Sequence, residues 1–410
     1  MRKLLTFIWI FIITFSVIVY DTKAIDTPPT VSADGVVLMD KNTGQILYSK
    51  NLDSPYPPAS TTKIMTALLA LEKCNLDDVV TIGKNATDID GSKIYIFEGE
   101  KLTIRDLLYS LLLQSANDCA VALAEHISGS TQEFVKLMNT RAKELGCKNT
   151  NFVNPHGLYD DKHRTSARDL ALILRELSKH EDFKKIATTQ VYVINPTNKE
   201  PNKRFIGNKD KLVLKRSKCY YEGCEGGKTG YTIQSKHSFV ATATRDNKSL
   251  IAVLLHDAKH TYWDDVINLF NFGFSNYTRE KLYSKNQCLY NYKINDNSSI
   301  PVLATEDFYY LRKNGDKDVP ELKVNNAPLN NKFFKKGDII LTGNIVYKNQ
   351  NLGKVNLASG ADHSSKKLYL NKLNLNNLKY NKYLIIGTPI GILILLVLIF
   401  GLKKSKRNRI

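Results

Sequence analysis

The C-terminal end of the chain carries the feature that most restricts its fold. Leu384 to Leu402 is an apolar stretch of nineteen residues without a charge, long enough to cross a bilayer as a helix. Five basic residues follow in the last eight positions: Lys403, Lys404, Lys406, Arg407 and Arg409. Positive residues stay on the cytoplasmic side of a membrane. We therefore expect a single transmembrane helix at 383–402, a basic cytoplasmic tail at 403–410, and the preceding chain outside the cell.

The N-terminal end predicts export. Arg2 and Lys3 precede a short uncharged stretch from Leu4 to Val19, and Thr22-Lys23-Ala24 follows. A basic start, a short apolar segment and a small residue are typical of a secretory signal peptide, which we place at 1–24. Lys23 makes the cleavage site imperfect, so an uncleaved membrane anchor remains an alternative.

Charge and cysteine content limit the partners, disulfides and cofactors that we expect. The net charge of +18 favours long-range attraction to anionic wall polymers or lipid headgroups. Seven of the positive charges lie in the two membrane-flanking clusters, at 2–3 and 403–409, which leaves about +11 on the exported part, where we interpret most lysines as solubilising charge. The predicted topology places this part outside the cell, so we expect no nucleic-acid partner. The chain has six cysteines, too few for a disulfide scaffold at this length, although Cys219 and Cys224 are close enough to bridge a turn. Cysteine and histidine spacings do not match a metal site, and we expect neither a metal nor another cofactor.

The exported part of the chain has the pattern of an α+β domain followed by a small all-β domain. Strand-like runs separated by short turns predict two hairpins, at 36–48 and at 239–255. Apolar periodicity predicts helices between them and one after the second hairpin: 64–71, 107–113, 117–127, 134–145, 168–177 and 264–274. Strands that come from distant parts of the chain and flank a helical region indicate an antiparallel sheet with a helical subdomain.

The remaining segments set the predicted domain boundaries. Helix signals are scarce from 276 to 359, and short β-rich runs occur at 289–294, 300–303, 307–311, 339–341 and 344–347. We assign a catalytic domain to 25–275, an all-β domain to 276–362 and a stalk rich in Lys, Asn and Leu to 363–382. The stalk leucines also fit an amphipathic helix, but only loosely.

A serine and a lysine one helical turn apart open the helical region. The stretch Pro57-Pro-Ala-Ser-Thr-Thr-Lys63 places Ser60 three residues before Lys63, just ahead of an apolar run. Serine at a helix start is favoured as a cap. The same spacing places a hydroxyl beside an amine, which is the arrangement of a nucleophile and its base. We expect Ser60 to begin the helix and also to serve as a nucleophile.

Two further motifs favour the catalytic interpretation. Ser115-Ala116-Asn117 lies 55 residues after Ser60, and Lys228-Thr229-Gly230 begins 113 residues after Ser115. Each motif alone is a common cap or turn. The ordered trio is the active-site signature of penicillin-binding proteins and class A β-lactamases.

The chain resembles the serine-type D-alanyl-D-alanine carboxypeptidases of peptidase family S11, which are low-molecular-mass penicillin-binding proteins. The resemblance rests on five stretches: PPASTTKIM at 57–65, SAND at 115–118, NPHGL at 154–158, GKTGYT at 227–232 and SFVATAT at 238–244. It implies a β-lactamase/transpeptidase-like catalytic domain, a smaller β domain and a membrane anchor. It also implies a bacterial enzyme that binds peptidoglycan stem peptides ending in D-Ala-D-Ala and is acylated by β-lactam antibiotics.

The site residues follow from the motifs and from the resemblance together. Ser60 is the predicted acyl-ester nucleophile, Lys63 the general base and Ser115 a proton relay to the leaving D-alanine. The predicted substrate-binding residues, with the Tyr231 backbone N–H completing an oxyanion hole, are Asn117, Lys228, Thr229, Gly230 and Tyr231. We assign no role to His156, His126, His256 or His260, and we expect Asp118 to be structural.

The departures from the family pattern bear on substrate preference and turnover rate, and two other functions are kept as alternatives. Gly227 stands where the family usually has an aliphatic residue, and Ser235-Lys236 stands where it usually has Ala-Gly. One alternative is a membrane-anchored serine β-lactamase, although no convincing deacylating glutamate lies between the second and third motifs. Another is a non-catalytic wall-binding or penicillin-sensing protein, although the intact motifs argue against it. Endopeptidase activity on cross-links also remains open.

Overall fold

The computed structural model describes residues 27–295 and 298–364 of the 410-residue chain. The predicted signal peptide, transmembrane helix and cytoplasmic tail, and nearly all of the predicted stalk, lie outside these residues. Within them, no helix is both long enough and apolar enough to cross a membrane.

The described chain divides into two compact units. The first runs to Gln287 and takes in Ala304–Asn325 and Gly343–Val355, and the second holds the rest.

A five-stranded antiparallel sheet forms the centre of the first unit. Its strand order is β2-β1-β9-β8-β7, with β1 at Gly35–Asp40, β2 at Ile46–Lys50, β7 at Cys224–Thr232, β8 at Lys236–Arg245 and β9 at Lys248–Asp257. The two predicted hairpins are therefore confirmed, and β1 pairs with β9 although more than 200 residues separate them in sequence. Strand β7 lies at one edge of the sheet, with β8 on its only paired side.

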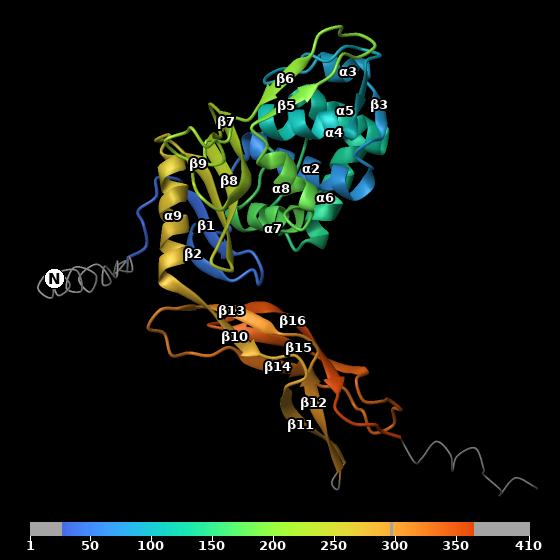
Figure 1. Cartoon of the computed structure of the whole chain (residues 1–410), viewed down its shortest axis with the longest axis vertical. Helices are drawn as coiled ribbons and strands as arrows, with labels where there is room; N and C mark the ends of the chain where they lie inside the picture. The colour runs from blue at the N-terminus through green and yellow to red at the C-terminus, as the bar shows by residue number, and fades with distance from the viewer. Residues whose placement is uncertain (1–26, 296–297, 365–410) are drawn as a thin grey trace, which may run out of the picture. The chain divides into compact units, whose positions relative to one another are not determined.

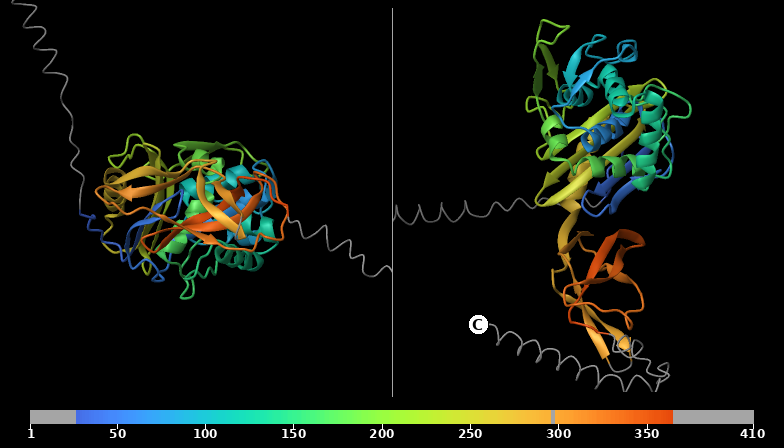
Figure 2. Two further views of the ribbon diagram at one scale, coloured as in Figure 1. Left: turned by 90° about the horizontal axis from the view of Figure 1, so that it is seen from below. Right: turned by 90° about the vertical axis from the view of Figure 1, so that its right-hand side faces the viewer.

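Helices cover both faces of this sheet (Figure 1). Val36 and Leu38 of β1 pack with helix α9 (Tyr262–Asn276) on one face, while Val37 and Met39 pack with the helical subdomain on the other. This alternation follows from the two-residue period of a strand, and burial of both faces explains why β1 is apolar throughout. The second view in Figure 2 looks onto the side covered by the helical subdomain.

The helical subdomain is built around apolar helices from the middle of the chain. Its elements are η1 (Ala59–Thr62), α2 (Lys63–Lys73), α3 (Lys84–Thr87), α4 (Ile104–Tyr109), η2 (Ser110–Gln114), α5 (Asn117–Ser128), α6 (Thr131–Glu144), α7 (Ala167–Leu177) and α8 (Glu181–Ala187). Two small sheets flank them, β3 (Val79–Thr81) with β4 (Lys101–Thr103), and β5 (Val191–Ile194) with β6 (Arg204–Gly207). The predicted helix at 107–113 is in fact two segments, because α4 gives way to the π-helical turn η2.

The C-terminal part of the chain is all β within the described residues. Strand β10 (Tyr277–Tyr283) pairs with β13 (Phe308–Lys313). A five-stranded sheet has the order β11-β12-β16-β15-β14, formed by β11 (Cys288–Asn295), β12 (Ser298–Ala304), β14 (Glu321–Asn325), β15 (Ile339–Tyr347) and β16 (Gln350–Ser359). The runs predicted separately at 339–341 and 344–347 form the single strand β15. All six cysteines are free thiols, including Cys219 and Cys224.

Candidate active site

Ser60 lies in a tight turn directly before helix α2. Residues Ala59–Thr62 form the 3₁₀ turn η1, and neither η1 nor α2 has a side-chain cap at its start. The prediction that Ser60 caps the helix is therefore wrong, because Ser60 lies inside the turn and not ahead of it. Side chains three residues apart eclipse each other in a 3₁₀ turn. This geometry places Lys63 Nζ 3.2 Å from Ser60 Oγ.

Lys63 is completely buried, and its amine contacts two further oxygen atoms. Nζ donates to Asn117 Oδ1 and to the His156 backbone carbonyl, each at 2.6 Å. Burial lowers the pKa of Lys63 well below its ordinary value, and the nearby charge of Lys228 lowers it further. The neutral amine that a general base requires is therefore favoured here.

The second motif lies where two helical segments meet. Helix η2 ends at Gln114, the next residue Ser115 adopts a left-handed conformation with φ of 63°, and α5 begins at Asn117. Ser115 is 9% exposed, and Asn117 is held at both ends of its side chain. Its Oδ1 accepts from Lys63, and its Nδ2 donates to the Asp90 carbonyl over 2.6 Å. These contacts fix the orientation of the Asn117 amide.

The third motif runs along edge strand β7, against the turn that holds Ser60. A Cβ atom on Gly230 would lie 2.8 Å from the Ser60 backbone nitrogen, so only glycine permits this approach. Lys228 is 3% exposed, and its Nζ donates to the Thr229 carbonyl over 2.8 Å. Burial, followed by the charge of Lys209, lowers the pKa of Lys228 to about 7.

The glycine that departs from the family pattern also has a structural reason. A Cβ atom on Gly227 would lie 2.3 Å from the Val240 carbonyl oxygen of β8. Strands β7 and β8 thus approach each other too closely at this point for a larger residue. In the second departure, Ser235 closes the turn between these strands, because its backbone N–H donates to Thr232 Oγ1 over 2.9 Å.

The loop at 154–158 supports the site through its backbone. Gly157 has φ of +88°, and a Cβ atom there would lie 1.9 Å from the Ala59 carbonyl oxygen, so this loop packs against the Ser60 turn. The His156 side chain accepts a hydrogen bond from the Leu158 N–H, and burial lowers its pKa to about 3. His156 has no role predicted from the sequence. The structure adds one for its carbonyl, which binds Lys63.

Two further residues of the site, Lys209 and Asp210, follow β6 and were not predicted from the sequence. Lys209 Nζ donates to the Gln114 carbonyl over 3.1 Å, next to Ser115. Asp210 is buried, its Oδ2 has no hydrogen-bond partner, and burial raises its pKa to about 6. Both side chains act electrostatically on Lys228. A Lys-Asp pair in a loop is too common in sequence to signal this position.

Comparisons with known proteins agree with the site. Residues 22–259 match the D-alanyl-D-alanine carboxypeptidase family of S11 peptidases, and residues 277–365 match the C-terminal domain of penicillin-binding protein 5. The D-alanyl-D-alanine carboxypeptidase DacF of Bacillus subtilis is 37% identical over 300 residues, which cover 71% of this chain and 75% of the relative. DacA of Haemophilus influenzae is 33% identical over 353 residues, which cover 82% of this chain and 85% of the relative. The crystal structure of penicillin-binding protein 5 from Haemophilus influenzae matches with a TM-score of 0.66 and 30% identity, covering 82% of this chain and 98% of that one.

Proposed function

This chain belongs to the D-alanyl-D-alanine carboxypeptidase family of S11 peptidases, and on that premise we propose that Ser60 carries its chemistry. In this proposal, Ser60 attacks the peptide bond between the last two D-alanines of a peptidoglycan stem peptide. The terminal D-alanine leaves, and water then hydrolyses the acyl-enzyme. A β-lactam, as a mimic of the same bond, acylates the same oxygen atom.

The contact between Lys63 and Ser60 is the single observation that carries this proposal. Once it has lost a proton, which its lowered pKa favours, the lysine amine has two hydrogens and one lone pair. The two 2.6 Å contacts, to Asn117 Oδ1 and to the His156 carbonyl, use both hydrogens. The lone pair is then left for the third neighbour, Ser60 Oγ, at 3.2 Å. Lys63 is thereby oriented to accept the hydroxyl proton as the serine attacks.

Strand β7 supplies the binding surface for the substrate. Because β7 is an edge strand, its free side can pair with an extended peptide. Lys228 and the Thr229 hydroxyl suit the terminal carboxylate, and Gly230 leaves room beside Ser60. We assign the oxyanion hole to the backbone N–H groups of Ser60 and Tyr231. Removal of one such donor typically costs about 3 kcal/mol of transition-state stabilisation.

Ser115 and Asn117 complete the assignment. Ser115 is mostly buried at the end of η2, and we assign it the transfer of the proton from Lys63 to the leaving amine. Asn117 orients Lys63 through its Oδ1. One Nδ2 hydrogen is engaged by Asp90, so the other is the one available to a substrate amide.

We also propose that the enzyme works outside a bacterial cell, tethered to the membrane. The support is the sequence pattern: a basic and then apolar start at 1–24, and an uncharged stretch with a basic tail at 383–410. The proposed catalytic domain, 25–275, and the proposed β domain, 276–362, lie between these ends.

Two readouts on the full-length protein test the assignment of Ser60. Ser60→Ala should abolish both D-alanine release from a peptide ending in D-Ala-D-Ala and covalent labelling by a fluorescent penicillin. Ser130→Ala, which removes only the helix cap of α6, should keep both. Persistence of either signal in Ser60→Ala would overturn the assignment. A wild-type label lost within seconds, with little D-alanine released, would indicate a β-lactamase instead.

A further inference from the structure

The segment between α3 and β4 presents two aromatic residues to solvent. Residues 94–97 alternate between inside and outside: Ile94 and Ile96 are buried, whereas Tyr95 is 71% exposed and Phe97 45% exposed. Exposed apolar surface that is rimmed by polar groups commonly marks a binding site. The arrangement therefore indicates a contact surface.

This segment is bonded directly to the second catalytic motif. The Asn117 N–H donates to the Ser92 carbonyl over 2.6 Å, and Asn117 Nδ2 donates to the Asp90 carbonyl. The neighbouring Asp118 is buried, and its Oδ2 accepts from the Ile94 N–H at 3.0 Å and the Ile96 N–H at 3.4 Å. The exposed rings thus belong to the same rigid loop that braces the active site.

The backbone at Tyr95 is held in an uncommon conformation. Its φ is +60°, in the left-handed region that a residue as large as tyrosine seldom adopts. The residues on both sides, Ile94 and Ile96, are fixed by Asp118. Strain of this kind persists where the surroundings impose it, and it is commonest at functional sites.

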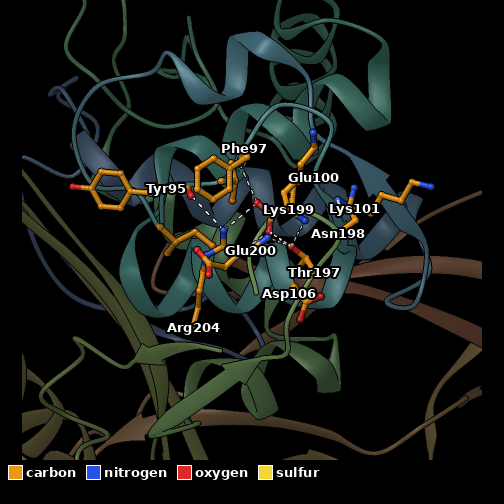
Figure 3. A network of polar contacts seen from close by, with 12 residues as sticks. Tyr95, Phe97, Glu100, Lys101, Asp106, Thr197, Asn198, Lys199, Glu200 and Arg204 are labelled. Atoms are coloured by element: carbon orange, nitrogen blue, oxygen red, sulfur yellow. Dashed lines mark hydrogen bonds and ion pairs between the residues drawn. The ribbon is translucent and has the colours of Figure 1, made fainter. Parts of the chain in front are cut away.

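A buried ion pair fixes the other end of the loop (Figure 3). Glu100 is completely buried, and Arg204 of β6 binds it through Nη1 to Oε1 at 2.6 Å and Nη2 to Oε2 at 3.0 Å. The same carboxylate accepts from the Phe97 N–H and from Thr197 Oγ1. These bonds outweigh the effect of burial and lower the pKa of Glu100. The loop is therefore preorganised.

Each exposed ring has a cation beside it. Lys93 Nζ lies 5.9 Å from the centre of the Tyr95 ring, and the Arg204 guanidinium lies 5.8 Å from that of Phe97. We call these four side chains, Lys93, Tyr95, Phe97 and Arg204, the aromatic rim. Two apolar ring faces with the Lys93 amine beside them suit a pyranose sugar, which has a C–H face and oxygen atoms around its edge.

We propose that the aromatic rim binds a sugar ring of the glycan strand that carries the stem peptide. This inference rests on the proposed function, because a stem peptide in the active site brings its attached glycan with it. The segment that carries the rim is hydrogen-bonded to Asn117 of that site, and its rigidity reduces the entropy lost on binding. The rim then favours glycan-linked substrate over free peptide.

The test compares two substrates on the full-length enzyme. One is a free pentapeptide ending in D-Ala-D-Ala, and the other is the same pentapeptide on its disaccharide. Tyr95→Asn removes the ring but keeps a residue that tolerates the left-handed backbone, and Phe97→Leu removes the ring but keeps apolar bulk. We expect each variant to lose about tenfold in kcat/KM on the disaccharide-pentapeptide. We expect kcat/KM on the free pentapeptide to stay within about twofold.

The control is Phe333→Leu, which changes a 72%-exposed phenylalanine outside the rim and should alter neither value. Penicillin labelling of each variant verifies that the active site is folded. Equal losses on both substrates would overturn the proposal, because the rim would then act on the peptide or on the catalytic motif. Unchanged values on both substrates would overturn it as well. Failure of the proposed function is distinct from either result, since the wild-type enzyme would then release no D-alanine from the free pentapeptide.

Discussion

Lys63 Nζ lies 2.6 Å from Asn117 Oδ1, closer than the 3.2 Å that separates it from Ser60 Oγ. The amide oxygen is uncharged, so it orients the amine without favouring its protonated form strongly. Asn117→Asp would place a negative charge at this position and raise the pKa of Lys63. We expect acylation at pH 7 to slow by about 10²-fold and the pH optimum to move upward.

The measurement is the rate of labelling by a fluorescent penicillin between pH 6 and pH 10. Asn117→Ala serves as the matched variant, because it loses the orienting contact but adds no charge. Acylation of Asn117→Ala should be slow, but its pH optimum should not move upward. An unchanged pH profile in Asn117→Asp would contradict the assignment of Lys63 as the base.

The alkaline limit of activity should depend on Lys228 and Asp210. The pKa of Lys228 is about 7, so raising the pH above this value removes the charge that holds the substrate carboxylate. Asp210 raises the pKa of Lys228, and Asp210→Asn should move the alkaline limb of kcat/KM to lower pH. A peptide ending in a carboxamide needs no cation and is the control substrate. If kcat/KM for the carboxamide peptide falls at the same alkaline pH, Lys228 does not act by holding the substrate carboxylate.

Burial of Lys228 should reduce stability in a pH-dependent way. Its folded-state pKa of about 7 lies below the ordinary value of 10.5, so between these values the unfolded chain binds a proton that the folded protein lacks. Stability therefore rises with pH across this window, and the full cost of the buried charge applies below pH 7. Lys228→Met should raise the melting temperature more at pH 6 than at pH 10, while abolishing activity. Thermal unfolding at pH 6 and at pH 10 measures this difference. A larger rise of the melting temperature at pH 10 would contradict the predicted direction.

Gly157 should be essential for the turn that holds the nucleophile. A Cβ atom there would lie 1.9 Å from the Ala59 carbonyl oxygen, and displacement of Ala59 would move the adjacent Ser60. Gly129, with a similar φ of +77°, has no atom within 4 Å of its added Cβ and provides a matched control. We expect Gly157→Ala to abolish penicillin labelling. Gly129→Ala should lower the free energy of unfolding by about 1 kcal/mol but should still be labelled by penicillin. Equal labelling of the two variants would show that the contact is unimportant.

The Glu100–Arg204 pair should stabilise the helical subdomain. Glu100 is fully buried, and loss of one partner of a buried ion pair leaves a charge without compensation. We expect Arg204→Met to lower the free energy of unfolding by about 3 kcal/mol, and Glu100→Gln to have a comparable effect. In the double variant the loss should be smaller than the sum of the two, as denaturant titration of all four proteins would show. Additive losses would mean that the two side chains act independently.

The amino-acid sequence by itself determined the class of fold and the chemistry. The strand and helix patterns that predict the β1–β2 hairpin, the β8–β9 hairpin and α9 are local, because they follow from the two-residue and 3.6-residue periods of strand and helix. Each of the three motifs is also local, and their order along the chain is what marks them as a site. These signals were enough to identify Ser60, Lys63, Asn117 and Lys228 as candidates.

Tertiary structure decided what those residues contact. The His156 carbonyl at Lys63, Asp210 near Lys228, and the packing of Gly157 on Ala59 all join segments that are distant in sequence. The lowered pKa of Lys63 arises from burial, which depends on how the helices and the sheet pack, and no single segment encodes it. The mistaken prediction of a cap at Ser60 has the same origin: the chain tightens into a 3₁₀ turn there, packed against the 154–158 loop and β7, and this moves the serine from the helix start into the site.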